Sequence, residues 1–426
     1  MKLVIFSLLL TLFVDGCSGG KSGEPPHNPA KENTALDSNR VNNSTATANG
    51  KKPIANSETT NAIQFVREQE FKSTDEVIIG QIATVVVDDK DHVFIADKGQ
   101  TTIQVFNRDG SYRASIGNQG KGPGEFTAIS PNTTMKIHSN RLYVSDVTEG
   151  FQFFPHRIHV FSLEDLSFLQ TIKLIPKNKN NFEKLQKYNP KRFYPLTGGR
   201  LLVAYHRAMW EYRDTVSYIR YVIQDSTGTI LTSPILEQKD LTYLVYTYPS
   251  GNSSMHSFPF YRRSLFALSN DNDLYAANTE EFKIQVYNTQ GEPIRTFQHP
   301  FNNQPLRLRK LIDRYRKNNY MARLDRHEGD NVALKMIRQA PDIPDTWPAL
   351  QSMFFDDKNQ LWISTIIAGK EVYKWYVLKK SGEITATFTW PRDKPIEKVR
   401  NGKLYTRETD QETGLEEIVR YNIVME

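Results

Sequence analysis

The chain has 426 residues and a formal net charge of +6, so it is long enough to bury a core without the help of disulfides. A mean hydropathy of -0.54 is too polar for a protein that crosses a membrane many times. The single cysteine excludes disulfide frameworks and cysteine-rich metal sites, and the 11% of aromatic residues favours strands over helices.

The first residues have the layout of an export signal. Lys2 supplies a positive start, and an apolar run from Leu3 to Val14 follows it. This run is shorter than the roughly 20 residues that a membrane-spanning helix needs, and it is typical of a secretory signal. We expect residues 1–16 to be removed and the protein to be exported.

The only cysteine, Cys17, comes directly after this apolar run. The stretch Val14-Asp15-Gly16-Cys17 resembles the lipobox of bacterial lipoproteins, although Asp15 departs from the small or apolar residue usual there. The resemblance implies that Cys17 is lipidated, with acyl chains such as palmitate, and that the protein is anchored in the cell envelope, facing the periplasm. An ordinary secretory peptide, in which Cys17 has no role, is the alternative.

Residues 17–61 are predicted to form a disordered tether. After Cys17 this segment has no Phe, Tyr or Trp, and its large aliphatic residues are Leu36, Val41 and Ile54. Such a composition cannot bury enough apolar surface to offset the entropy cost of ordering. The segment would hold a folded body away from the membrane.

From residue 62 onward the sequence repeats one unit six times. Each unit contains an apolar strand, a short turn rich in Gly, Asn and Asp, and a second strand that begins with aliphatic residues. The second strands are VFIAD (93–97), LYVSD (142–146), LLVAY (201–205), LYAAN (274–278), LWIST (361–365) and LYTRE (404–408). A third strand follows in every unit, so the spacing predicts four-stranded blades.

A fourth strand is present in five units, and the sixth unit lacks one. In the third unit, GTILTSPIL (228–236) is the expected fourth strand. The unpaired strand IQFVREQEF (63–71) precedes the first unit and can supply the missing edge, which would close a ring and remove exposed strand edges. Residues 62–426 are therefore predicted to be an all-β domain, a six-bladed β-propeller closed by an N-terminal strand.

The segment GNQGKGPGEF (117–126), together with VFIAD and TTIQVFNRDG, resembles NHL-type repeats. Residues 62–426 as a whole resemble the six-bladed propeller lipoproteins of Bacteroidetes-like bacteria. The resemblance implies a fold and hardly restricts the function, because propellers serve binding, scaffolding and several chemistries.

A helical insertion is expected between the fourth and fifth blades, at residues 305–340. Leu308, Leu311, Ile312 and Tyr315 have helical spacing, and Val332, Met336 and Ile337 indicate a second short helix. The helices are expected to pack on one mouth of the propeller. The segment has ten Lys and Arg against four Asp and Glu, a surplus equal to the charge of the entire chain.

This charge suggests either a site for an anionic partner or a solvated helix face whose basic side chains cover apolar surface. If it is a site, the candidate ligand-binding residues lie in the helical insertion and on the loop after the second strand of the third blade. They are Arg307, Arg309, Lys310, Arg314, Arg316, Trp210, Tyr212 and Arg213.

A second insertion, at residues 238–263, is rich in aromatic residues. These are Tyr243, Tyr246, Tyr248, Phe258, Phe260 and Tyr261. Aromatic side chains on loops commonly anchor a binding partner, but they also commonly pack beneath the loop. The sequence leaves both interpretations open.

Asp97, Asp146, Asn278 and Glu408 occupy equivalent places at or near the ends of second strands. Such oxygens could converge on a Ca²⁺ ion, as they do in propeller lactonases, or each could fix the turn of its own blade. We expect the turn role and no cofactor. Histidines are scattered, and no motif of nucleophilic catalysis is present.

The sequence thus predicts an exported, lipid-anchored propeller that acts as a binding or scaffolding module rather than as an enzyme. The expected partner is an anionic glycan, a lipid headgroup or an envelope protein, and not a nucleic acid, because an exported protein does not normally meet one. The alternative is a metal-dependent, lactonase-like hydrolase or lyase with Ca²⁺ at the axis.

Overall fold

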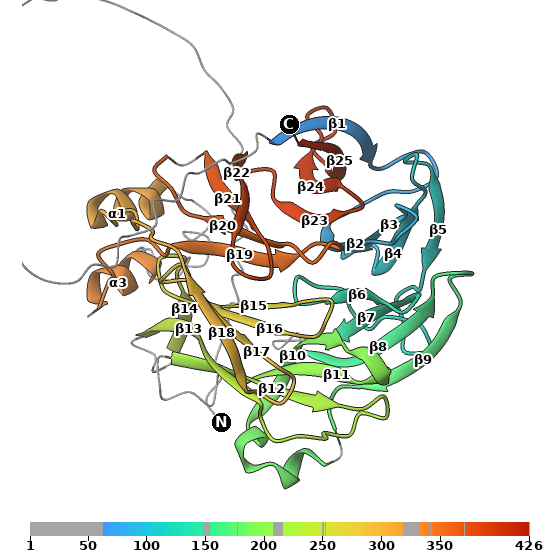
Figure 1. Cartoon of the computed structure of the whole chain (residues 1–426), viewed down its shortest axis with the longest axis horizontal. Coiled ribbons are helices and arrows are strands. Elements are labelled where there is room, and N and C mark those ends of the chain that lie inside the picture. The colour runs from blue at the N-terminus through green and yellow to red at the C-terminus, as the bar shows by residue number, and fades with distance from the viewer. Residues whose placement is uncertain are drawn as a thin grey trace, which may run out of the picture. The chain divides into compact units, whose positions relative to one another are not determined.

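The structure is a computed structural model that describes residues 63–147, 154–176, 178–207, 216–248, 251, 253–317, 332–340, 342–369 and 371–425. The signal, Cys17, the tether and the loop with Trp210, Tyr212 and Arg213 lie outside these residues. Six antiparallel sheets are arranged as the blades of a propeller (Figure 1). The predicted fold class is confirmed.

In the first three blades, consecutive strands pair in order from the first strand to the last. The strands are β2 (Ile82–Val87), β3 (Val93–Asp97), β4 (Thr102–Phe106) and β5 (Tyr112–Ile116); β6 (Met135–His138), β7 (Arg141–Val147), β8 (Pro155–Ser162) and β9 (Phe168–Lys173); and β10 (Tyr188–Pro195), β11 (Leu201–Arg207), β12 (Val216–Gln224), β13 (Leu236–Thr247) and β14 (Ser253–Ser257).

The fourth and fifth blades follow the same order, and the sixth combines the two ends of the described chain. Their strands are β15 (Ser264–Leu268), β16 (Leu274–Asn278), β17 (Lys283–Tyr287) and β18 (Pro293–Gln298); β19 (Leu350–Phe355), β20 (Leu361–Thr365), β21 (Val372–Leu378) and β22 (Ile384–Pro391); and β23 (Ile396–Arg400), β24 (Lys403–Thr409), β25 (Glu416–Met425) and β1 (Ile63–Phe71).

The ring closes as predicted, because β1 pairs with β25 as the fourth strand of the sixth blade. The antiparallel register runs from Ile63 opposite Met425 to Phe71 opposite Ile418. In Figure 1, the blue β1 lies beside the red β25. The fully buried Phe71 then packs with Tyr405 and Ile418 against the first blade, so the closing strand also contributes to the core.

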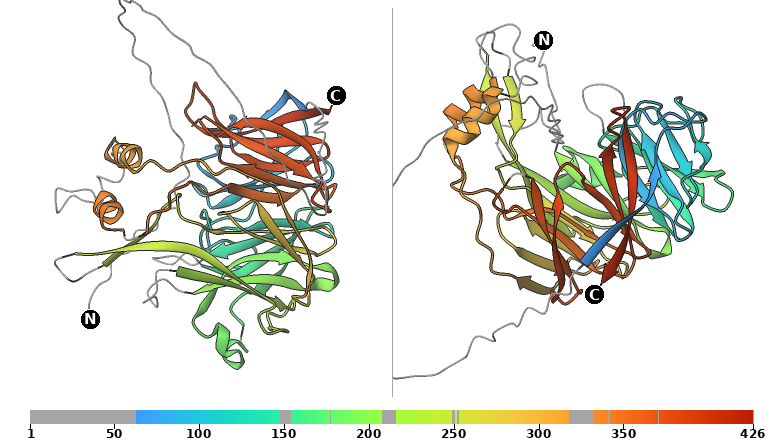
Figure 2. Two further views of the ribbon diagram at one scale, coloured as in Figure 1. Left: turned by 60° about the vertical axis from the view of Figure 1, so that its left-hand side comes forward. Right: turned by 90° about the horizontal axis from the view of Figure 1, so that it is seen from above.

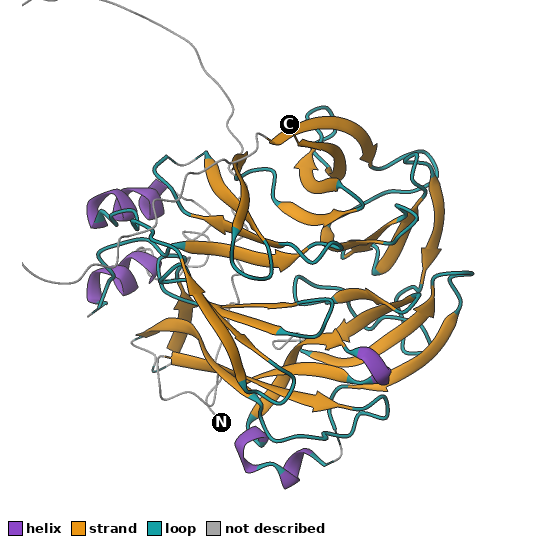
Figure 3. Cartoon of the chain, viewed as in Figure 1, coloured by secondary structure: helices purple, strands orange, loops and turns teal. Residues whose placement is uncertain are grey.

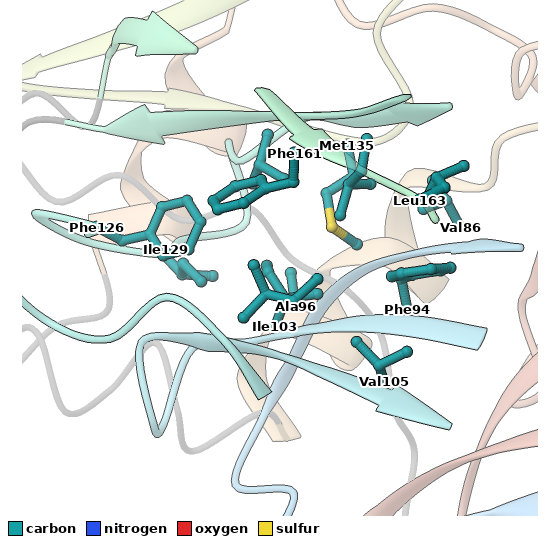
Figure 4. Packing of buried hydrophobic residues seen from close by; sticks show 13 residues of the cluster. Val86, Phe94, Ala96, Ile103, Val105, Phe126, Ile129, Met135, Phe161 and Leu163 are labelled. Carbon is teal, nitrogen blue, oxygen red and sulfur yellow. The ribbon is translucent and has the colours of Figure 1, made fainter. Parts of the chain in front are cut away.

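The main core is divided among the six interfaces between neighbouring blades. Each interface holds one cluster of buried apolar side chains, and together the six clusters run around the ring. Figure 4 shows the cluster between the first two blades, which includes Phe94 from β3 and the neighbouring rings of Phe126 and Phe161, whose centroids lie 6.2 Å apart. Because each blade is covered on both faces, the second strands are apolar at consecutive positions.

The GPGEF segment belongs to this first interface. Gly117 has a φ of +68°, and a Cβ there would lie 2.5 Å from Cε2 of Phe126. The loop therefore needs glycine, both for its backbone conformation and for the close approach of the ring. Oε2 of Glu125 accepts a hydrogen bond from the Gly122 amide at 2.8 Å, which folds the loop back on itself.

The two insertions lie where expected, but two details differ from the prediction. The fourth strand of the third blade is β13, which begins at Leu236, so most of GTILTSPIL precedes it rather than forming it. β13 has 12 residues and continues beyond the blade to pair with β14. Much of the aromatic insertion is therefore a long hairpin, an extension that the local sequence pattern did not reveal.

The helical insertion contains α1 (Leu308–Lys317) and α3 (Val332–Gln339). These helices pack on the β13–β14 hairpin rather than directly on the propeller mouth, because the hairpin supplies the apolar surface that they cover. Figure 3 shows the helices beside the hairpin, and Figure 2 shows both projecting away from the blades. Short 3-10 helices occur at Lys179–Asn181, Glu183–Leu185 and Thr197–Gly199.

Among the described residues, no helix has the length and apolarity needed to cross a membrane.

Candidate functional site

One face of the propeller carries both insertions. Within each antiparallel blade the second and fourth strands run in the same direction, so they end at the same face. The hairpin continues from β13, and the helices follow β18, both of which are fourth strands. We call this side the insertion face.

The hairpin and helices share a small apolar core of their own, which we call the insertion core. Its buried residues are Phe258, Phe260, Tyr261, Leu311, Val332, Ala333, Leu334, Met336 and Ile337. Phe260 is 1% exposed, and its ring centroid lies 5.3 Å from that of Phe258. Phe258, Phe260 and Tyr261 of the second insertion thus pack beneath it and hold the helices, and the structure does not offer these three buried rings as anchors for a partner.

Three of the predicted basic residues form an exposed patch at the start of the helical insertion. Arg307, Arg309 and Lys310 are exposed, and none of them forms an ion pair with another described residue. We call these three residues the basic patch. Arg314 and Arg316 lie in α1 beyond the residues whose side chains the structure describes.

The residues of the metal alternative are engaged within their own blades. Asp97 is fully buried, and its carboxylate accepts hydrogen bonds from the amides of Gly80, Gln81 and Gly99 at 2.8 to 3.0 Å. Asn278 accepts one from the amide of Glu280. These contacts are those of residues that fix turns.

Glu408 accepts hydrogen bonds from Lys394, Thr406 and Tyr421 at 2.6 to 2.9 Å. These bonds hold the pKa of Glu408 below its usual value even though burial acts in the opposite direction. Within the described part of the chain, no three His, Cys, Asp or Glu residues are placed to hold a metal ion.

Asp146 is the centre of a buried cluster that the sequence reasoning missed. Its carboxylate accepts hydrogen bonds from the Thr127 amide at 2.7 Å and from Nε of Arg157 at 2.7 Å. Nε2 of His156 and Nε2 of His159 lie 3.6 and 4.0 Å from its Oδ2. Burial and the Arg157 charge lower the pKa of His159 to about 4, so this imidazole is neutral at pH 7.

A second basic region lies in the middle of the propeller. The first strands β2, β6, β19 and β23 surround a cavity of about 190 Å³, which we call the central cavity. Its lining residues are Thr84, Val85, Val86, Val87, Met135, Lys136, Ile137, Phe354, Glu397, Lys398 and Arg400. Many of them lie near the hairpins that follow the first strands, so the cavity is nearer the face opposite the insertion face.

The central cavity has more cationic than anionic groups available. Lys136 and Lys398 are partly buried, and neither forms an ion pair or a hydrogen bond through its ammonium with the described residues. Glu397 is engaged elsewhere, because its Oε1 lies 2.7 Å from Nη2 of Arg407. Burial, with the charges of Lys398 and Arg192, lowers the pKa of Lys136 to about 7.

The sequence contained a signal for these residues that the repeat pattern obscured. The first strand of the second blade reads MKIH, and that of the sixth reads IEKVR, so each has a lysine beside apolar residues. A charged residue in the innermost strand of a blade is close to the channel. Which residues of other blades lie beside such a charged residue, however, depends on closure of the ring.

Comparisons with known proteins agree with the propeller fold. The sequence matches the family model DUF5128, described as a 6-bladed beta-propeller, over residues 42–249. No curated protein matches the sequence. The structure is similar to that of a Bacteroides fragilis protein described as an exported protein. The two share 14% identity and a TM-score of 0.47, and the match covers 87% of this chain and 98% of the other.

Two further solved structures have comparable coverage. A member of the duf4221 family from Bacteroides vulgatus has 10% identity and a TM-score of 0.48, covering 86% of this chain and 99% of the other. A virginiamycin B lyase from Staphylococcus aureus has 12% identity and a TM-score of 0.36, covering 85% and 100%. Similarities at this level concern the fold alone.

Proposed function

We propose that this protein is an exported, lipid-anchored propeller that binds an anionic partner in the cell envelope through its insertion face. The observation that carries the proposal is the basic patch, because three exposed cations that form no ion pair with the described residues stand on an insertion that the ring does not need for closure. Exposed positive charge attracts anionic surfaces and speeds encounter with them.

The insertion core supports this function by giving the patch a fixed position. Leu311 of α1 is 3% exposed and packs with Met336 and Ile337 of α3 on the hairpin. One side of α1 is therefore held against the body of the protein. Arg307, Arg309 and Lys310 remain in solvent, where a flat, extended partner can reach them.

The proposal is tested with a polyanion. The full-length protein, purified in a mild detergent, is applied to immobilised dextran sulfate and to neutral dextran at increasing NaCl concentrations. Binding to dextran sulfate should weaken as salt increases, because salt screens exposed charges. The triple variant R307A/R309A/K310A should bind about a hundredfold more weakly, since each cation near an anionic surface contributes about 1 kcal/mol.

The matched control removes the same charge from the opposite face. Lys90, Arg200 and Lys358 are exposed residues close to the turns after the first strands, and K90A/R200A/K358A should bind dextran sulfate like the native protein. Equal loss in both triple variants would mean that only net charge matters and would contradict a site on the insertion face. Binding of the native protein to neutral dextran would contradict it as well.

A further inference from the structure

We propose that the central cavity is a second, separate site that binds one small oxyanion between Lys136, Lys398 and Arg400. The ligand class is that of phosphate, sulfate and short dicarboxylates. This inference does not rest on the basic patch. The cavity is lined by the first strands of four blades, and it lies nearer the face opposite the insertion face.

The first argument is the balance of charge. Lys136 from β6 and Lys398 from β23 lie on different blades, and the charge of Lys398 disfavours the protonated form of Lys136. Two partly buried cations that repel one another are costly unless an anion accompanies them. The one acidic residue in the lining, Glu397, is held by Arg407 at 2.7 Å and does not neutralise them.

Nearby acids outside the lining are also engaged. Oδ1 of Asp356 accepts a hydrogen bond from the Gln360 amide at 2.7 Å, and its Oδ2 accepts one from Nε1 of Trp362 at 2.9 Å. Asp357 accepts one from the Asn401 amide at 3.1 Å. Burial and the charge of Arg400 lower the pKa of Lys398. The two carboxylates act in the opposite direction, but they do not outweigh this effect, and the pKa stays below its usual value.

The second argument is unused hydrogen-bonding capacity. Nε of Arg400 is buried and has no hydrogen-bond partner among the described residues. The strands β2, β6, β19 and β23 are each the last strand on the inner side of their sheet, so they present an unpaired backbone edge towards the channel. An oxyanion accepts hydrogen bonds from ammonium, guanidinium and amide groups, and the residues that line the cavity offer all three kinds of donor.

The third argument is size. A water molecule takes about 30 Å³ in the liquid, so a cavity of about 190 Å³ holds the equivalent of roughly six. That space suits an ion with five to seven heavy atoms.

The groups that face Lys136 make its charge sensitive to a ligand. Lys398, Arg400 and Glu397 come from β23, and Arg192 and Tyr194 come from β10, with the Lys136 ammonium 5.3 Å from the Tyr194 ring centroid. Burial, together with the charges of Lys398 and Arg192, lowers the pKa of Lys136 to about 7 without a ligand. A bound dianion would raise that pKa, so binding at pH 7 to 8 would take up a proton.

The experiment is calorimetric titration of the full-length protein in detergent, in HEPES and then in Tris, with NaCl as background. Inorganic phosphate, sodium sulfate and malonate are the three probes. We expect one bound ion per chain, and a heat that differs between the two buffers by the uptake of a fraction of a proton. The three probes distinguish a phosphate or sulfate site from a dicarboxylate site.

The test variant is K136M/K398M, and its matched control is K90M/K358M, which removes the same charge from exposed turns beside the first strands. We expect the test variant to bind the preferred ion at least about tenfold more weakly and the control to bind it normally. R307A/R309A/K310A should also bind it normally, which separates this site from the insertion face.

Folding is checked by thermal unfolding of every variant without added anion. Should K136M/K398M fail to fold, Arg400→Gln tests the same site, because it removes the donor that lacks a partner. The preferred ion should raise the unfolding temperature of the native protein and not that of the test variant. No binding of any probe by the native protein, or equal binding by the test and control variants, would overturn the proposal.

Discussion

The basic patch and the central cavity are both cationic, but their charges are supported in different ways. The patch consists of neighbouring residues, Arg307, Arg309 and Lys310, all in contact with water. The cavity brings together Lys136 and Lys398, which are 262 positions apart in the sequence and partly buried. Water supports the first group at little cost, whereas keeping the second group charged without a counter-ion is costly.

This difference indicates what each region is suited to bind. A solvated patch suits a large, flat partner, and its effect is screened by salt. A confined group of cations suits an ion small enough to enter, and its effect is screened less because water is partly excluded. Three stability measurements test how the charges and the insertion core are supported.

The largest effect is expected at Asp146, which belongs to neither region. Asp146→Asn keeps the shape of the side chain but leaves Arg157 without its buried anion, 2.7 Å away. Removing one partner of a buried pair costs about 3 to 5 kcal/mol. We expect that loss in urea unfolding of the full-length protein, with no change in the metal content of the purified protein.

Metal analysis by mass spectrometry tests the alternative in which Asp146 is a metal ligand. A stoichiometric metal that the native protein carries and Asp146→Asn lacks would reveal a third functional region at the ends of the second strands. It would also favour the hydrolase or lyase interpretation. Asp97→Asn is the parallel variant, since Asp97 accepts hydrogen bonds from backbone amides and forms no ion pair with the described residues.

The next effect concerns the independence of the insertion core. Phe260→Ala should cost about 3 kcal/mol, because it leaves a void among packed aromatic rings. The loss should be local: amide exchange should speed up in α3 and β14 and remain slow in the blades. In the matched variant, Phe355→Ala, the void lies between the fourth and fifth blades, so exchange there should speed up instead.

Uniformly faster exchange in both variants would show that the insertion core and the propeller unfold together. The basic patch would then be part of the ring's own cooperative unit. Local loss in Phe260→Ala should also weaken binding to dextran sulfate, since α1 would no longer hold the patch in place.

The smallest expected effect is a gain in stability at the central cavity. Lys136→Met removes a partly buried cation while keeping its volume, and we expect it to add about 1 to 2 kcal/mol at pH 7 in a buffer without multivalent anions. Lys358→Met, in an exposed turn, should change stability by less than about 0.5 kcal/mol.

The same variant should change the pH dependence of stability. The pKa of Lys136 falls from 10.5 to about 7 on folding, so between these values the unfolded chain binds a proton that the folded chain releases. Its contribution to stability is therefore lowest below pH 7 and rises as the pH increases towards 10. Lys136→Met should lose this rise, and a parallel slope in both proteins would contradict the shifted pKa.

The architecture of this protein could be predicted from local sequence patterns. Six second strands and the lone strand at residues 63–71 were sufficient to predict a closed ring, because strand patterns and turn residues are local signals. The helical spacing of apolar residues in 305–340 was sufficient to predict two helices. The charge of the basic patch could be counted directly from the sequence.

The tertiary structure alone decided which residues meet. The aromatic residues after Leu236 support the helices because β13 continues past its blade, and no local pattern sets where a strand stops. Lys136 and Lys398 face one cavity only because the ring closes. Closure pairs residues far apart in the chain, so their charges and pKa values depend on distances that a linear sequence does not contain.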